Sequence, residues 1–249
     1  MMEPAEAAAA ATALVVSKDA LACKLIINGL RPLAIGAELC EEVFAAARLL
    51  DKQKFEAVIV DLQLGEGAML VMEQLRFSRS NRTAVTFAIA TGDAARAPVK
   101  LDSTFVLPRP LSADSINQIL RASYGLVVRE RRRYFRCPLA VPAFVRARQP
   151  EEEFLCQTVN ISEGGVAINA RAMLDPALST AVRFSLPDRS SQLFSETRVR
   201  WRGQEGLVGL EFLSLAATQK SELQEWLARK LDETLPENVA ALFRSVGQV

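Results

Sequence analysis

The chain has 249 residues, half of them hydrophobic, and its 30 Lys and Arg side chains nearly balance 29 Asp and Glu, for a net charge of +1. This length and hydrophobic content predict two ordinary folded domains and exclude a largely disordered chain. The near-neutral charge argues against a polycation that coats nucleic acid or membrane. No stretch approaches the roughly 20 apolar residues of a membrane-spanning helix.

Histidine and paired cysteines are both absent. The sequence contains no His, the residue that most often serves as general base and as imidazole metal ligand. Because no catalytic constellation remains, we predict that the protein is not an enzyme and carries no metal ion or cofactor. The four cysteines stand far apart without a CxxC pair, which indicates buried free thiols rather than a zinc site or disulfides: Cys23, Cys40, Cys137 and Cys156.

The N-terminal segment lacks the features of a secretion signal. An apolar run at 7–16 follows Glu3 and Glu6, whereas a signal sequence begins with positive charge. We therefore expect a cytoplasmic protein without membrane attachment.

Apolar strand-like runs alternate with helical patterns from residue 13 to about residue 126, which predicts a parallel α/β sheet. Continuous hydrophobic runs are typical of strands covered on both faces. They predict strands at 13–16, 57–60, 85–90 and 104–107, with a shorter strand near 33–35. Hydrophobic residues at helical spacing predict helices at 19–30, 39–50, 68–77 and 113–122.

The polar residues that follow these strands are expected to cluster, because functional groups gather at the carboxyl ends of parallel strands. They are Asp61, Thr91 and Arg109, the last followed by a proline. With this arrangement the segment resembles a response-regulator receiver domain over about 110 residues, which implies a flavodoxin-like parallel sheet. The resemblance places Asp61 at the phosphoacceptor position, Thr91 at the hydroxyl position and Arg109 where the family has a lysine.

One departure from the receiver pattern concerns the metal. Receivers close their first strand with an acidic pair that holds magnesium, whereas this strand runs into Ser17 and Lys18, with a single acid at Asp19. An ammonium group in that place should repel the ion. We interpret the segment as a pseudo-receiver that docks a partner or self-associates, in which Asp61 is a strand-end carboxylate or a vestigial phosphoacceptor. The alternative is autophosphorylation of Asp61 with Asp19 helping to hold a metal.

A basic stretch follows the last helix of this half. Residues 129–136 contain five Arg, and seven Arg stand against one acid between residues 129 and 148. Such a run is often a solvated surface or linker. Its position predicts an anion-binding linker at 126–136, between a first domain at 1–125 and a second at 137–232.

Short strands with period-2 alternation and intervening turn residues dominate the second half, which predicts a small six-stranded antiparallel barrel. The expected strands lie at 139–145, 154–159, 166–169, 182–186, 197–201 and 207–212. A helix with one apolar stripe is expected at 216–232. In the tail at 233–249, a last helix at 236–246 packs either on the barrel or on a second chain.

Two motifs in this half form a specific combination. Arg132 and Arg136 make an R-x-x-x-R pair, and Asn160, Ser162 and Gly165 make an N-x-S-x-x-G sequence. The second motif alone is also compatible with an ordinary hairpin turn. Together with a strand that begins soon after the arginines and a tryptophan that closes a later strand, the motifs make residues 129–232 resemble the PilZ domain, whose ligand is cyclic di-GMP.

The resemblance implies a ligand site on these five residues and on Arg131, which directly precedes the motif. The planar guanidinium group of arginine can donate two parallel hydrogen bonds to phosphate oxygens or to the O6 and N7 acceptors of guanine. Asn160 and Ser162 would accept hydrogen bonds from N1 and N2 of guanine. Gly165 would permit a positive φ or a close approach of the backbone to the base.

We therefore expect a cyclic di-GMP-binding effector in bacterial second-messenger signalling, in which the ligand orders the Arg-rich linker and reorients the two domains. Spacing alone leaves the register open, because Arg129 and Arg133 form a second R-x-x-x-R pair. One alternative is a PilZ-fold interaction scaffold that binds no nucleotide. Another is a regulator that contacts DNA or RNA through the Arg stretch, against which the near-neutral charge and the lack of a helix-turn-helix pattern count.

Overall fold

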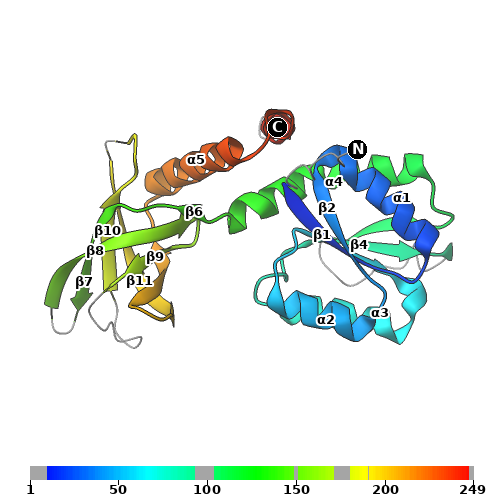
Figure 1. The fold of residues 1–249 in the computed structure, drawn as a ribbon, viewed down its shortest axis with the longest axis horizontal. Coiled ribbons are helices and arrows are strands. Elements are labelled where there is room, and N and C mark those ends of the chain that lie inside the picture. Colours follow the sequence, from blue (N-terminus) through cyan, green and yellow to red (C-terminus); the bar gives the residue numbers. More distant parts are fainter. Residues whose placement is uncertain (1–9, 93–103, 149–150, 171–179, 190, 247–249) are drawn as a thin grey trace, which may run out of the picture. The chain divides into compact units, whose positions relative to one another are not determined.

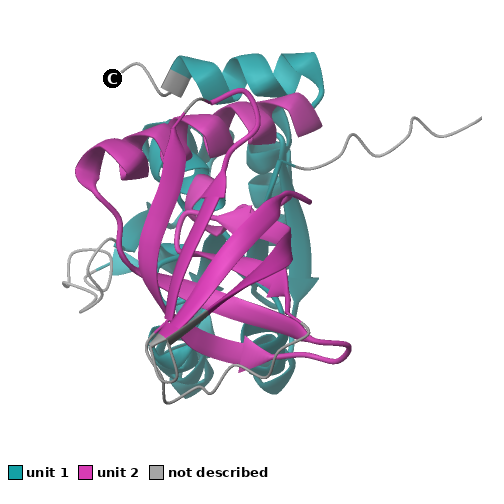
Figure 2. Ribbon diagram, turned by 90° about the vertical axis from the view of Figure 1, so that its left-hand side faces the viewer, with its two compact units in different colours: residues 1–131, 235–249 teal, residues 132–234 magenta. Residues whose placement is uncertain are grey.

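The computed structural model describes residues 10–92, 104–148, 151–170, 180–189 and 191–246. The chain forms two compact units, residues 1–131 together with 235–249, and residues 132–234 (Figure 2). In sequence, the second unit is therefore inserted between two parts of the first. Within the described ranges, none of the helices combines the length and hydrophobicity needed to cross a membrane.

The first unit is built on a five-stranded parallel sheet with strand order β2-β1-β3-β4-β5 (Figure 1). Its strands are β1 (Ala11–Val16), β2 (Ile35–Cys40), β3 (Ala57–Asp61), β4 (Val85–Ala90) and β5 (Thr104–Pro108). Its helices are α1 (Ala20–Leu30), α2 (Val43–Lys52), α3 (Glu66–Phe77), α4 (Ala113–Tyr134) and α6 (Glu237–Val246), with 3-10 turns η1 (Arg31–Leu33) and η2 (Leu62–Leu64). The predicted flavodoxin-like fold of this half is confirmed.

Burial on both faces explains why the central strands have continuous apolar sequences. All residues of β3 and β4 are buried. On one face of the sheet, Leu14 and Val58 pack with Val71 of α3 in a hydrophobic core that α2 also joins. Helices α1 and α4 cover the other face (Figure 1), where Gly29 of α1 lies against Ile116 of α4. This arrangement leaves the carboxyl ends of the strands as the place where polar side chains gather.

Helix α4 is longer than the sequence pattern predicted. The helix expected to end near residue 122 continues to Tyr134. Leu120, Tyr124 and Val128 are all buried at intervals of four residues, so one apolar stripe continues through the segment. The charged residues beside this stripe obscured it in the sequence.

Ion pairs with buried carboxylates hold the last turns of α4 within the first unit. Lys54 Nζ donates to Glu130 Oε1 at 2.5 Å, and Thr83 Oγ1 donates to the same oxygen at 2.6 Å. The Glu130 side chain is only 6% exposed. One residue further on, Arg131 Nη1 lies 3.7 Å from Oε1 of the buried Glu56, whose other carboxylate oxygen accepts a backbone N–H of β1. Helix α4 is thus held on the first unit as far as Arg131 by charge as well as by packing, and its last residues, 132–134, belong to the second unit.

The region between α1 and α2 also differs from the prediction. Strand β2 runs from Ile35 to Cys40, and α2 begins only at Val43, so the first residues of the helix predicted at 39–50 belong to the strand. As an edge strand with half-buried and exposed positions along its middle, β2 lacks the continuous hydrophobic signal of its neighbours.

The C-terminal helix α6 packs on the first unit rather than on the barrel. Its Phe243 is fully buried and meets Tyr124 of α4 edge to face, with 6.0 Å between ring centroids. The neighbouring Val239 and Ala240 are buried as well. The predicted tail helix therefore exists, and α4 supplies part of the surface that it covers.

The second unit is a closed antiparallel barrel. Its strands are β6 (Cys137–Pro138), β7 (Pro142–Arg148), β8 (Glu151–Ser162), β9 (Gly165–Asn169), β10 (Thr180–Ser185), β11 (Gln192–Arg202) and β12 (Leu207–Ser214). The strand order is β6-β8-β7-β10-β11-β12-β9, and a β8–β9 pairing closes the six longer strands on themselves. The predicted six-stranded barrel is confirmed.

Helix α5 (Ala217–Thr234) lies across this barrel (Figure 2). Its buried stripe consists of Leu223, Trp226, Leu227 and Leu231, which are the positions that the sequence indicated. All four cysteines of the chain are free thiols, three of them buried and Cys156 half-buried.

Candidate functional site

A cavity of about 520 Å³ opens on the barrel of the second unit. Strands β8, β9, β11 and β12 supply most of its wall, and the segment where α4 ends and β6 begins, the turn between β8 and β9, and Lys220 of α5 supply the rest. Its side chains are predominantly polar and charged. The lining residues are Arg133, Tyr134, Arg136, Asn160, Ser162, Glu163, Gly164, Gly165, Val166, Ala167, Arg200, Trp201, Gly209, Leu210, Glu211 and Lys220.

The hairpin between β8 and β9 positions one side of the cavity. Ser162 pairs with Gly165 across the hairpin, and Ser162 Oγ donates to the Gly165 carbonyl oxygen at 3.2 Å. A register shift between Thr158 and Asn160 interrupts the ladder just before this turn. Asn160, Ser162 and Gly165 all line the cavity, so the structure brings the three residues of the N-x-S-x-x-G sequence to one place.

Gly165 has a packing role that the sequence did not reveal. A Cβ at this position would overlap the carbonyl oxygen of Leu210 on β12. The glycine therefore lets β9 and β12 approach each other. The φ of Gly165 is not in the positive region.

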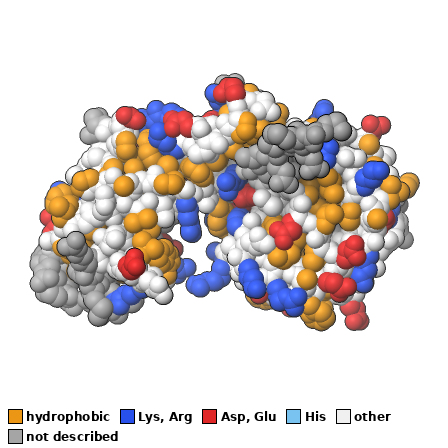
Figure 3. Space-filling model, viewed as in Figure 1, with side chains coloured by type: hydrophobic (Ala, Val, Ile, Leu, Met, Phe, Trp, Pro, Cys, Tyr) orange, Lys and Arg blue, Asp and Glu red, His pale blue; other side chains and the backbone are white. Residues whose placement is uncertain are grey.

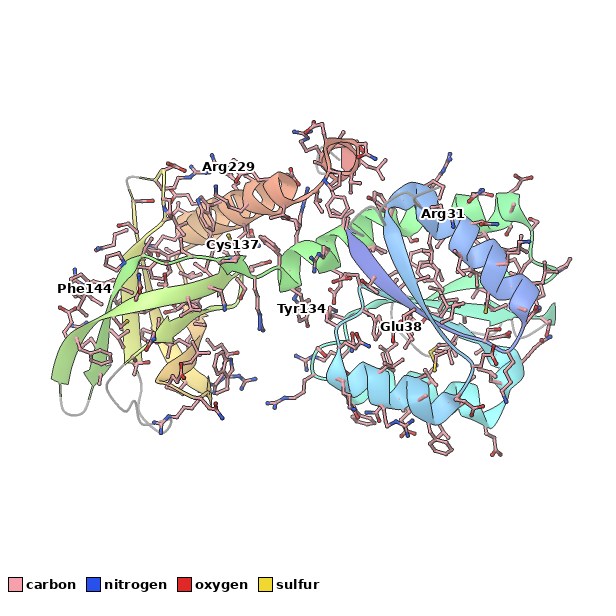
Figure 4. All side chains as sticks on the ribbon, viewed as in Figure 1. Arg31, Glu38, Tyr134, Cys137, Phe144 and Arg229 are labelled. Carbon is pink, nitrogen blue, oxygen red and sulfur yellow. The ribbon has the colours of Figure 1, made fainter. Side chains whose placement is uncertain are left out.

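The arginines of the basic stretch divide between the two units. Arg133 and Arg136 line the cavity, as does Tyr134, which ends α4 (Figure 4). Arg131 instead lies beside Glu56 in the first unit, and Arg132 is not among the described residues that line the cavity. Of the six residues predicted to bind the ligand, the structure thus gathers four around one cavity.

Two more cations and two acids complete the charge of the cavity. Arg200 and Lys220 join the two lining arginines, and Glu163 and Glu211 oppose them. Four positive against two negative side chains leave a net charge of +2. Glu211 is itself paired on the strand surface, with Arg198 Nη2 at 3.0 Å and Arg200 Nε at 3.5 Å. The surplus of positive charge favours an anionic ligand.

Trp201 forms an exposed aromatic wall that sequence reasoning did not assign to the site. Strand β11 has a register shift between Val199 and Trp201, after which Trp201 pairs with Gly209 of β12. A Cβ on Gly209 would overlap the indole, so the absence of a side chain lets the ring lie against the backbone. Trp201 as a whole residue is still 42% exposed. The position of this tryptophan at the end of a predicted barrel strand is the sequence feature that could have assigned it to the site.

A second polar cluster lies at the carboxyl edge of the sheet in the first unit. Arg109 donates from Nη1 to Asp19 Oδ2 and from Nη2 to Asp61 Oδ2, both at 2.7 Å. Ser17 Oγ donates to the same Asp61 oxygen at 2.8 Å. The hydrogen bond from Arg109 lowers the pKa of Asp19, as do the backbone N–H groups that it caps. Thr91, the predicted hydroxyl residue, follows β4 and is exposed.

Comparison with family models matches the second half of the chain. The family model described as PilZ domain matches residues 130–229, so the C-terminal half contains a PilZ domain. No curated protein matches the chain.

Solved structures resemble each half separately. The PilZ domain of CeSA from a cellulose-synthesizing bacterium is 19% identical over 37% of this chain and 94% of that chain, with a TM-score of 0.31. The Bacillus subtilis inhibitor of motility, MotI/DgrA, is 23% identical over 41% of this chain and 52% of that chain, with a TM-score of 0.36. The receiver domain of the sensor histidine kinase PA1611 from Pseudomonas aeruginosa is 20% identical over 46% of this chain and 98% of that chain, with a TM-score of 0.39.

Proposed function

We propose that the protein is a cyclic di-GMP-binding effector or adaptor in bacterial second-messenger signalling, and that the barrel cavity is its ligand site. One observation carries the proposal: Arg136, Asn160 and Ser162 meet at a cavity whose side-chain charge is +2. Cyclic di-GMP is a dianion with two guanines. The cavity volume of about 520 Å³ lies within the roughly 300–1,000 Å³ of small-molecule sites.

Each lining group has a counterpart on this ligand. The guanidinium groups of Arg133 and Arg136 are suited to phosphate oxygens and to the O6 and N7 acceptors of guanine. The carbonyl of Asn160 and the hydroxyl of Ser162 are suited to the N1 and N2 donors on the opposite edge of guanine. The one hydroxyl hydrogen of Ser162 is donated to the Gly165 carbonyl oxygen. The lone pairs of the hydroxyl oxygen can therefore accept a hydrogen bond from guanine.

Arg131 and Arg132 enter the proposed site through a change in the end of α4. In the structure the helix continues through both residues, and Arg131 lies beside Glu56. We include Arg132 in the ligand site because it is the first arginine of the R-x-x-x-R motif, and Arg131 because it directly precedes that motif. Ligand binding then draws Arg132 onto the phosphates, separates Arg131 from Glu56 and changes the helical Arg-rich segment to a new ordered conformation that reorients the two domains.

The first test is calorimetry of the full-length protein with cyclic di-GMP. At a protein concentration of about 50 μM, we expect a saturable heat, with no comparable heat from GTP. Absence of heat would favour the alternative of a PilZ-fold interaction scaffold. On the face shown in Figure 3, each unit carries both basic and acidic side chains. The net charge of the chain is only +1, which does not favour the nucleic-acid alternative.

Trp201 is expected to stack on one guanine. Base–aromatic stacking contributes about 1–3 kcal/mol per base, so Trp201→Ala should weaken cyclic di-GMP binding about 5- to 150-fold. Trp201→Phe, which keeps an aromatic face, should retain most of the affinity. Calorimetry measures both. Ligand binding should also quench tryptophan fluorescence in the parent protein but not in Trp201→Phe, where only the buried Trp226 remains. Equal affinities of parent and Trp201→Ala would remove the ring from the site.

We assign the receiver-like unit a docking role, with a protein partner or a second copy of the chain, and no catalytic role. Asp61 and Arg109 lie at the carboxyl ends of the strands of this unit. We propose that Asp61 is a vestigial phosphoacceptor.

A further inference from the structure

The cluster at the carboxyl edge of the first unit has every carboxylate oxygen occupied. Asp61 Oδ2 accepts from Arg109 and Ser17, and Asp61 Oδ1 accepts the backbone N–H of Gln63 at 3.1 Å. Asp19 Oδ2 accepts from Arg109. The remaining oxygen, Asp19 Oδ1, caps α1 by accepting the backbone N–H groups of residues 21 and 22 at 3.0 and 3.1 Å. These contacts involve two carboxylates from different elements and one cation between them.

Magnesium in a receiver-type fold would need oxygen ligands at this edge, and the donor set does not fit it. Mg²⁺ takes an octahedral shell of oxygens and is usually held by one or two carboxylates. Here both carboxylates already bind one guanidinium, which lies between them. Nowhere in the described parts of the chain do three or more Cys, Asp or Glu residues stand together as potential metal ligands. A second cation would meet the charge of Arg109 at close range.

The guanidinium is also well protected from solvent. The side chains of Arg109 and Asp61 are 16% and 3% exposed, and that of Asp19 is 33% exposed. Arginine stays charged at all accessible pH values, and its planar fork can bind two carboxylates at once. Unlike a metal ion, it cannot dissociate from the protein.

We propose that Arg109 is a resident cation that replaces the divalent metal at this edge. It ties together β5, the carboxyl end of β3 and the amino end of α1, and the carboxylate of Asp61 is thereby closed to metal ions and to phosphoryl transfer. Without a metal as charge clamp, and with both oxygens of Asp61 hydrogen-bonded, a phosphodonor has no activated acceptor. The charge at this edge of the sheet is therefore fixed by Arg109 and does not change with the binding of a metal ion or with phosphorylation. This inference is independent of the ligand proposed for the barrel.

Metal titration of the full-length protein tests this proposal. With Mn²⁺ followed by electron paramagnetic resonance, we expect no stoichiometric binding to the parent protein at about 1 mM Mn²⁺. Acetyl phosphate with Mg²⁺ should leave Asp61 unmodified in intact-mass analysis. In Arg109→Ala the two carboxylates lose their cation, so the thermal midpoint in EDTA should fall by about 5–10 °C. Added Mn²⁺ should restore part of this loss.

The control is the double variant Arg109→Ala/Asp61→Asn, in which rescue by Mn²⁺ should disappear. Stoichiometric Mn²⁺ binding or a phosphorylated Asp61 in the parent protein would overturn the proposal. So would an Arg109→Ala variant with an unchanged midpoint and no gain of Mn²⁺. Should Arg109→Ala not fold, the parent protein alone decides: absence of both metal and label supports the resident cation, and presence of either refutes it.

Discussion

The Arg136→Ala variant is expected to bind cyclic di-GMP about 5- to 150-fold more weakly than the parent protein. Arg136 lines the cavity together with Asn160 and Ser162. A bidentate contact of arginine with guanine or phosphate contributes about 1–3 kcal/mol of binding free energy, which corresponds to this range of affinities. Isothermal titration calorimetry on the full-length protein measures the change directly.

Arg183→Ala is the matched control for this variant. Arg183 belongs to the same barrel, pairs with Glu153 at 3.0 Å and stacks over Phe144, but it does not line the cavity. We expect it to leave the dissociation constant within about twofold. If Arg136→Ala bound the ligand as tightly as Arg183→Ala, the cavity would not be the site.

Two further variants separate the possible registers of the arginine pair. Arg133 lines the cavity, whereas Arg132 does not. If the ligand binds without any change in α4, Arg133→Ala should lose affinity and Arg132→Ala should not. The proposed rearrangement of the helix end predicts a loss of affinity for Arg132→Ala as well, and its absence would limit the proposal to the preformed cavity.

The Lys54→Met variant is expected to lower the free energy of unfolding of the first unit by about 3–5 kcal/mol. Lys54 is paired with Glu130, and its loss leaves a carboxylate that is only 6% exposed without its cation. Removing one partner of a buried ion pair has this cost because the remaining charge is neither solvated nor neutralised. Urea unfolding followed by far-UV circular dichroism, with hydrogen exchange to assign the transition, measures the effect.

The exposed pair between Arg244 and Glu237 provides the comparison within the same unit. Their side chains are 53% and 84% exposed, so Arg244→Met should cost no more than about 1 kcal/mol. In Lys54→Met/Glu130→Leu the uncompensated charge is gone, and we expect most of the stability to return. A Lys54→Met variant as stable as Arg244→Met would show that Glu130 does not depend on this cation.

The sequence predicted those elements whose signal is local. The central strands β3 and β4 are buried on both faces, and their continuous apolar runs placed them correctly. The end of α4 was missed because its apolar stripe through Tyr124 and Val128 lies beside a dense run of charges. Helix propensity and the pattern of charges along the chain do not show which face of a helix will be covered by another part of the protein.

The same distinction applies to the two polar sites. Asn160 and Ser162 are neighbours in sequence, so a motif was enough to indicate them. Trp201 reaches the cavity only through a register shift in β11 and the bare backbone of Gly209, which are properties of strand pairing. Arg109 bridges Asp19 and Asp61 across 90 and 48 residues of sequence, and such a contact appears only once the strand order is known.

The position of α6 has a consequence for the biosynthesis of the chain. Phe243 covers part of α4 in the first unit, yet the ribosome delivers it only after the entire barrel has been translated. Domains generally fold as units during synthesis, the N-terminal one first. A first unit that folds during synthesis forms its sheet with the Tyr124 surface still uncovered, and α6 covers this surface only after the barrel has been translated.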